Sequence, residues 1–326
     1  MIKGIKIGWL SLILMLDIMA GAQTELGLLP FSNKLLLNPS FAGWNKNTTV
    51  WSSLQFSGHP ENKLNHTFTL TWDTWSERLK GGVALYYYQG LTGELNSNSS
   101  GAGLTFSKPI KTGTNGKLIP AIHFNAKTVF KQWFVQIIDG LVAEEILQPS
   151  PPGKEFIRCN IYQPRLGMLW NSNDIVMGAS GAYSFQQNVS EEVNLQYNPL
   201  YHFIFHITRS TSGYRKGLIS EPFKTVPELI LLYTDNLFLT RIGITTERTD
   251  QLFGLFIQNN YSDNIHGISG ILGWKLDHFR ITFSAGSAYS VPHQKVTFFG
   301  EANLGLTIPY VDFDQDKPWA VPNKNF

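Results

Sequence analysis

The chain has 326 residues, of which 43% are hydrophobic, 13% aromatic and 15% charged. Its formal net charge of +2 argues against nucleic-acid binding and against a strongly acidic substrate. The charged fraction is well below the roughly 25% of ordinary soluble domains. A low charge content combined with many aromatic residues suits a surface that faces lipid.

The N-terminus has the three parts of a secretory signal peptide. Two lysines precede an apolar run over residues 7–19, and the small-x-small sequence Ala-Gly-Ala follows it. We therefore expect cleavage of a signal peptide, residues 1–22, between Ala22 and Gln23. An uncleaved anchor is the alternative, but the run is shorter than the ~20 residues that span a bilayer.

The remaining chain offers neither a membrane-spanning helix nor a disulfide. No run of 18 apolar residues follows residue 22. Cys159 is the only cysteine, so an exported chain has no internal disulfide to stabilise it. A closed β-barrel would supply stability instead, because it pairs every backbone group.

Alternation of apolar and polar residues dominates the mature chain. Between Leu64 and Asp73, residues Leu64, His66, Phe68, Leu70 and Trp72 share one face and polar residues share the other. Such alternation indicates half-buried strands and not helices. We expect fourteen strands, at residues 47–57, 64–74, 80–89, 97–107, 117–130, 158–171, 174–185, 201–209, 224–234, 237–246, 251–260, 265–275, 278–288 and 296–308.

The expected strands favour a membrane barrel over a secreted β-sandwich. Most have the 9–11 residues or more that a tilted membrane-spanning strand needs, whereas ordinary strands average about five or six. An even number of strands also fits one barrel. We therefore predict an all-β fold, a single antiparallel outer-membrane barrel at 47–308. A periplasmic N-terminal segment, 23–46, precedes it and a polar tail, 309–326, follows it.

The connections predict which end of the barrel faces outward. With both termini in the periplasm, the long loops 131–157 and 186–200 face outward and the short turns 75–79 and 172–173 face inward, the usual asymmetry of these barrels. Five tryptophans are expected in interfacial girdles: Trp51, Trp72, Trp75, Trp170 and Trp274.

Basic residues gather at the expected inner turns and acidic residues at the outer loops. Ordinary interfacial charge is one interpretation. The other is a basic periplasmic rim that docks a partner through complementary charge, with Lys108, Lys111, Arg215 and Lys216 as its candidate residues.

No pattern in the chain indicates catalysis. There is no zinc-protease, nucleophile-elbow or P-loop motif. His202 and His206 share a face of one strand without the spacing of metal ligands. Asp312-x-Asp314-x-Asp316 lacks the Gly and Glu that complete a calcium loop. We expect a non-enzymatic protein with no catalytic residue, cofactor or metal site.

One segment carries a more specific signal. The sequence Asn38-Pro39-Ser40-Phe41-Ala42-Gly43, which we call the N-terminal motif, resembles the N-P-A-Y-A-G motif of the PorP/SprF family of type IX secretion outer-membrane proteins. Gln55-Phe56 and Gly82-Val83-Ala84-Leu85 also resemble segments of that family. The polar tail after Ile308 departs from the family pattern. The motif itself is expected either to seal the periplasmic mouth or to contact a partner directly.

The resemblance implies a role in type IX secretion and, in some members, gliding motility. It implies an outer-membrane location, with membrane lipid, periplasmic ring components of the machine and a secreted surface protein or adhesin as partners, and no nucleic acid. Two alternatives stay open: a transporter barrel for small or hydrophobic solutes, and a lipid-modifying barrel enzyme.

Overall fold

The computed structural model describes residues 33–44, 46–58, 65–92, 97–113, 116–132, 156–172, 174–188, 201–215, 221–234 and 237–309. The predicted signal peptide, its cleavage site at Ala22 and Gln23, and the tail beyond residue 309 lie outside these residues. Within the described ranges, no helix is long and apolar enough to span a membrane.

Strands make up nearly all of the described chain, after two short helical turns. The elements are α2 (Lys34–Leu37), η2 (Pro39–Phe41), β1 (Thr48–Gly58), β2 (Asn65–Ser76), β3 (Gly81–Thr92), β4 (Ser97–Ser107), β5 (Ile110–Thr112), β6 (Gly116–Gln132), β7 (Phe156–Ser172), β8 (Ile175–Tyr183), β9 (Phe185–Asn188), β10 (Tyr201–Arg209), β11 (Thr211–Arg215), β12 (Glu221–Thr234), β13 (Leu237–Arg248), β14 (Gln251–Asn260), β15 (Ile265–Leu276), β16 (Phe279–Ser290) and β17 (Lys295–Ile308).

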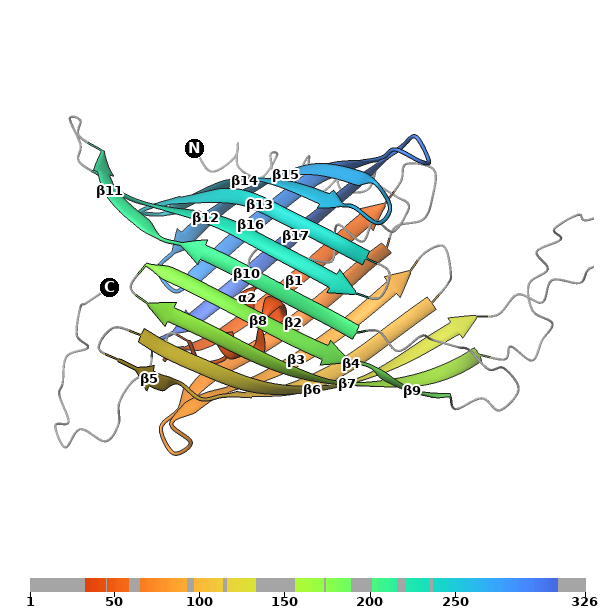
Figure 1. Ribbon diagram of the computed structural model, residues 1–326, viewed down its shortest axis with the longest axis horizontal. Helices are drawn as coiled ribbons and strands as arrows, with labels where there is room; N and C mark the ends of the chain where they lie inside the picture. Colours follow the sequence, from red (N-terminus) through yellow and green to blue (C-terminus); the bar gives the residue numbers. More distant parts are fainter. Residues whose placement is uncertain are drawn as a thin grey trace, which may run out of the picture.

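The strands close into one antiparallel barrel (Figure 1). β1 pairs with β17 from Thr48↔Ile308 to Gly58↔Phe298, which joins the two ends of the sheet. Three short elements, β5, β9 and β11, continue β4, β8 and β10 across a break and pair with the same neighbours. The barrel therefore has fourteen strands, which confirms the predicted fold and strand count.

The predicted strand positions agree closely with the structure. Apart from the extensions β5 and β11, every predicted end lies within about three residues of the observed one. The break between β4 and β5 falls at Pro109, which has no N–H for the sheet. The preceding Lys108 N–H still donates to Pro120 O over 3.0 Å.

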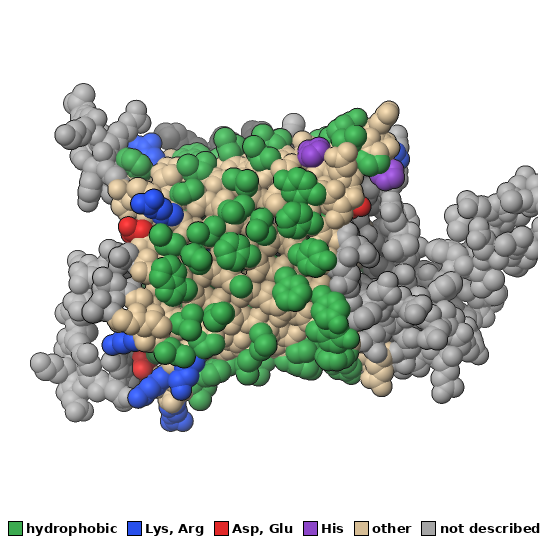
Figure 2. Space-filling view, viewed as in Figure 1, with side chains coloured by type: hydrophobic (Ala, Val, Ile, Leu, Met, Phe, Trp, Pro, Cys, Tyr) green, Lys and Arg blue, Asp and Glu red, His purple; other side chains and the backbone are tan. Residues whose placement is uncertain are grey.

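The two faces of the wall differ as alternation predicts. Apolar side chains cover the outer face, among them Leu166, which is 67% exposed, and Leu255, which is 65% exposed. Polar side chains such as Thr69 and Thr71 are buried on the inner face. On the face drawn in Figure 2, apolar side chains form a broad band across the wall, and Lys and Arg side chains are concentrated at one end. An outward apolar band is the surface that a bilayer requires.

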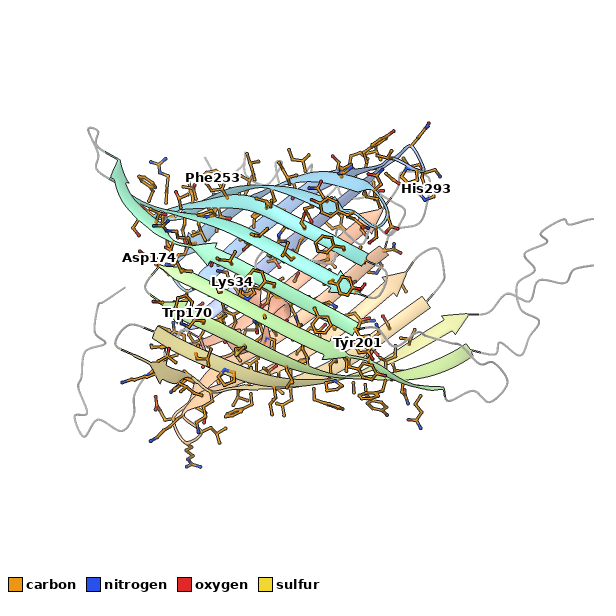
Figure 3. All side chains as sticks on the ribbon, in the orientation of Figure 1. Lys34, Trp170, Asp174, Tyr201, Phe253 and His293 are labelled. Carbon is orange, nitrogen blue, oxygen red and sulfur yellow. The ribbon has the colours of Figure 1, made fainter. Side chains whose placement is uncertain are left out.

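The two ends of the barrel carry different connections. The turn rim is the end with the turns 77–80, 249–250 and 277–278, and β1 begins and β17 ends there. The loop rim is the opposite end, with turns 261–264 and 291–294. Figure 3 shows Trp170 and Asp174 towards the turn rim, and Tyr201 and His293 towards the loop rim.

The tryptophan expectation holds for three residues and is wrong for Trp51 and Trp75. The side chains of Trp72, Trp170 and Trp274 are 37–43% exposed on the outer face. Trp51 lies on the inner face, where Gly305 leaves room for its ring. Trp75 lies on the inner face of β2. The Lys46 Nζ lies over its ring, 5.2 Å from the centroid, and its indole N–H donates to Glu77 Oε1 over 2.7 Å.

Candidate functional site

The N-terminal motif lies inside the ring of strands, where Figure 1 shows α2. Asn38 ends α2 and begins η2. Its backbone N–H donates to Lys34 O over 3.1 Å, and its Oδ1 accepts from the Ser40 N–H over 3.0 Å. Pro39 occupies the first position of η2, where its missing N–H costs nothing. Gly43, with φ of +60°, turns the chain towards β1.

The Asn38 side chain anchors the motif to the barrel wall. It is fully buried, and its Nδ2 donates to Met168 O and to Ala179 O, each over 3.1 Å. These two residues face each other across the β7–β8 pair. The same amide nitrogen lies 3.3 Å from Nε2 of His206 on β10. One side chain therefore bridges three neighbouring strands.

Two glycines form the slot that holds Asn38 and Pro39. A methyl group at Gly167 on β7 would come within 2.6 Å of Pro39 Cγ. A methyl group at Gly178 on β8 would come within 2.7 Å of Asn38 Nδ2 and would overlap the His206 ring. A larger residue at either position would push the motif off the wall.

Arg165 on β7 satisfies the last carbonyls of α2. Its guanidinium donates to Leu36 O over 2.9 Å, to Leu37 O, and to Ser180 Oγ over 2.8 Å. The Ser180 hydroxyl also donates to Leu37 O over 3.0 Å. Carbonyls at a helix C-terminus have no intrahelical partner, so a charged donor there both neutralises and positions them.

The other side of the motif is fixed to β2, β3 and β4. The Gly43 N–H donates to Asp73 Oδ2 over 3.1 Å, and the Ser107 hydroxyl donates to Ala42 O over 2.8 Å. Ala42 O also packs so closely on Gly82 that a side chain there would overlap it. The Phe41 ring centroid lies 5.3 Å from that of His206.

The structure brings the six motif residues together, and it describes the side chains of two of the four candidate rim residues. Lys108 and Lys111 are exposed at the turn rim, and Lys111 lies directly opposite the exposed Lys117. Of Arg215 only the backbone is described, in β11, and Lys216 lies outside the described residues. A role of this rim in docking stays a prediction.

Sequence reasoning missed the wall residues that hold the motif, namely Asp73, Ser107, Arg165, Gly167, Gly178, Ser180 and His206. His202 and His206 share one face of β10, as expected. That face is the inner one, where His206 contacts Asn38 and Phe41. In the part of the chain that the structure describes, no three His, Cys, Asp or Glu side chains form a group that could hold a metal ion.

A comparison with protein families covers both the N-terminal motif and the barrel. The family described as type IX secretion system membrane protein PorP/SprF matches residues 29–308. The chain belongs to the PorP/SprF family. It is therefore an outer-membrane component of the type IX secretion system, as the resemblance of the motif implied.

No curated protein matches the chain. Among solved structures, it is similar to the toluene transporter TbuX of Ralstonia pickettii, with 9% identity and a TM-score of 0.49 over 85% of this chain and 93% of that one. The toluene transporter TodX of Pseudomonas putida matches with 9% identity and a TM-score of 0.46, over 90% of this chain and 96% of that one. CdiB from Acinetobacter baumannii matches with 12% identity and a TM-score of 0.45 over 79% of this chain, which spans 60% of CdiB.

Proposed function

We propose that this PorP/SprF-family barrel is a non-enzymatic anchor that helps deliver large secreted proteins, including adhesins, or holds them at the outer membrane, with a link to gliding motility. Its proposed partners are the secreted surface protein and the periplasmic ring components of the machine. Family membership supports the secretion role, and the charge of the turn rim supports the docking of a partner.

The observation that carries this proposal is the exposed basic hairpin of β5 and β6. Lys111 and Lys117 are directly opposed across the hairpin and both are exposed. Like charges in opposed positions destabilise a strand pair. An acidic partner surface at this rim would relieve that repulsion and would be attracted over a distance.

The N-terminal motif is a fixed part of the barrel, and this supports the same proposal because the motif leaves the turn rim accessible to a partner. Its anchors are carbonyls and side chains of the inner wall, from Asp73 on β2 to His206 on β10. Of the two roles left open by the sequence, we propose the structural one, in which the motif occupies the mouth of the barrel and leaves the rim for partners. The turn rim then faces the periplasm.

Charge reversal tests the docking proposal. Lys108, Lys111, Arg215 and Lys216 are changed together to Glu in the full-length protein, and bound proteins are recovered from outer membranes and identified. We expect the loss of periplasmic ring components from the recovered complex. The matched control is Lys295→Glu, an exposed lysine at the loop rim, which should leave recovery unchanged. If the wild type, the fourfold variant and Lys295→Glu all recover the ring components equally, the docking proposal is overturned.

A further inference from the structure

A cluster of apolar side chains lies inside the barrel, away from lipid. It joins Leu37 of α2 to side chains from five strands: Ile204, Ile230, Leu232, Leu237, Leu239, Ala288 and Phe299. Ile265 packs against it from β15. None of the buried members is more than 4% exposed.

The neighbours of these residues in sequence show that the cluster points into the lumen. Phe203 and Tyr233 are each 52% exposed on the outer face, and Phe238 is 39% exposed there. Ile204, Leu232 and Leu239 follow or precede them by one residue and therefore point inward. Each cluster residue of the wall lies in the half of its strand nearest the loop rim.

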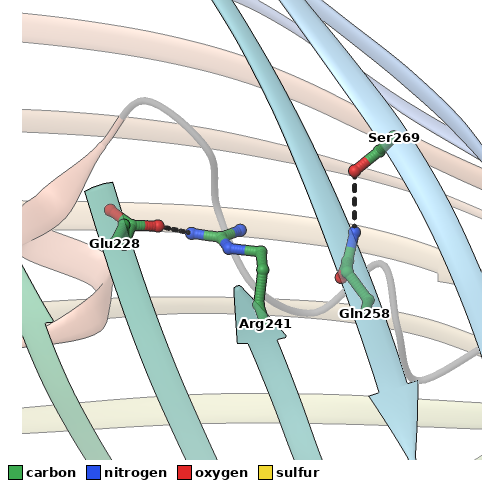
Figure 4. Close-up of polar contacts among 4 residues, drawn as sticks. All are labelled: Glu228, Arg241, Gln258 and Ser269. Atoms are coloured by element: carbon green, nitrogen blue, oxygen red, sulfur yellow. Dashed lines mark hydrogen bonds and ion pairs between the residues drawn. The ribbon is translucent and has the colours of Figure 1, made fainter. Parts of the chain in front are cut away.

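The polar side chains next to this cluster are also withdrawn from water. Arg241 on β13 is 1% exposed and pairs with Glu228 Oε1 over 2.8 Å, while Gln258 on β14 is fully buried and donates to Ser269 Oγ over 3.1 Å (Figure 4). The inner wall of an open aqueous barrel is polar and wet. Here the apolar and the polar residues are both packed.

The geometry points to a lumen that is closed to water and ions by this apolar cluster, with Leu37 as the member supplied by the N-terminal segment. Apolar constrictions stop ions by excluding water. Asn38, the next residue, is held by two wall carbonyls, so docking of the motif keeps Leu37 in the cluster. This inference goes beyond the proposed function and does not depend on it.

Conductance across a planar lipid bilayer tests the closed lumen with the full-length protein. The wild type should pass no steady current. Leu232→Ser with Phe299→Ser places hydroxyls in the cluster, and we expect ion current at least about tenfold above the wild-type baseline. The matched control is Leu255→Ser with Phe253→Ser on the outer face, which should stay silent. A steady wild-type current would overturn the inference and favour a solute transporter.

Thiol labelling tests the closed lumen independently, in case the Leu232→Ser and Phe299→Ser double variant does not insert into the bilayer. Cys159 is the only cysteine, so Cys159→Ser with Ala288→Cys places a single thiol in the cluster, at a position that is 2% exposed. A small membrane-impermeant thiol reagent should not label it, whereas Lys224→Cys in the same background, at an exposed inner position near the turn rim, should react. Rapid labelling at position 288 in a folded barrel would show a wet lumen and overturn the inference.

Discussion

Gly167 places the N-terminal motif through the absence of a side chain. A methyl group there would approach Pro39 Cγ to 2.6 Å, closer than carbon atoms approach without a shift. We predict that Gly167→Ala lowers the free energy of unfolding by about 1–3 kcal/mol, the usual range for overpacking. Urea unfolding in detergent micelles measures it.

The matched control is Gly270→Ala on the outer face, where the nearest atoms lie 3.7 and 3.8 Å from the added methyl group. Because it removes a flexible glycine from a strand without a clash, Gly270→Ala should be neutral or stabilising by up to ~1 kcal/mol. Equal losses for the two variants would show that the slot at Gly167 does not hold the motif.

We predict opposite effects on the free energy of unfolding when Ser40 and Ser107 are each changed to Ala. The Ser40 hydroxyl is buried and has no hydrogen-bond partner among the described residues, whereas the Ser107 hydroxyl donates to Ala42 O. Ser40→Ala should therefore leave the free energy of unfolding unchanged or raise it by up to ~1 kcal/mol, and Ser107→Ala should lower it by ~1 kcal/mol. Thermal unfolding of both variants checks the sign, and a loss for Ser40→Ala would reveal a partner for this hydroxyl.

At the scale of elements, β12 and β13 are joined across the lumen face by the pair of Glu228 and Arg241. Arg241 is 1% exposed, so Arg241→Met leaves Glu228 without its charged partner in a packed interior. We predict a loss of ~3–5 kcal/mol in the free energy of unfolding. Arg280→Met is the control, because Arg280 and Glu247 lie 3.5 Å apart and are each 34% exposed. That pair should contribute under ~1 kcal/mol.

The strands could be predicted because period-two alternation is local. Leu70 and Trp72 on one side and Thr69 and Thr71 on the other already separate the lipid face from the inner face. Trp51 shows the limit of this reasoning, because the space for a large ring on the inner face comes from Gly305, a residue that is distant in sequence but opposite in register.

Of the site, only the N-terminal motif could be predicted from the sequence, because its wall partners depend on contacts between distant strands. The six residues from Asn38 to Gly43 are contiguous, so their pattern is visible in the sequence. The residues that receive them, such as Arg165 and Gly178, come from different strands and meet only through the register of the barrel. A glycine or arginine at an inner strand position has many possible partners until that register is known.

At the scale of the whole molecule, closure of the barrel depends on β17, which pairs with β16 and β1 until Ile308. Removing residues 310–326 leaves all these pairs in place. We predict that the truncated protein, refolded in detergent, keeps the heat-modifiable gel mobility of a folded barrel, with the free energy of unfolding changed by less than ~0.5 kcal/mol.

A longer truncation provides the contrast. Ending the chain at Ala302 removes the partners of Thr48 to Ser53 on β1 and leaves an open sheet edge, which the bilayer interior does not tolerate. This variant should not fold.

Expression of the shorter truncation in cells then separates folding from insertion. If it folds in detergent but does not reach the outer membrane, the tail that ends at Phe326 carries the insertion signal, whereas normal insertion assigns that signal to β17. Failure of the shorter truncation to fold in detergent would instead make the tail part of the folded barrel.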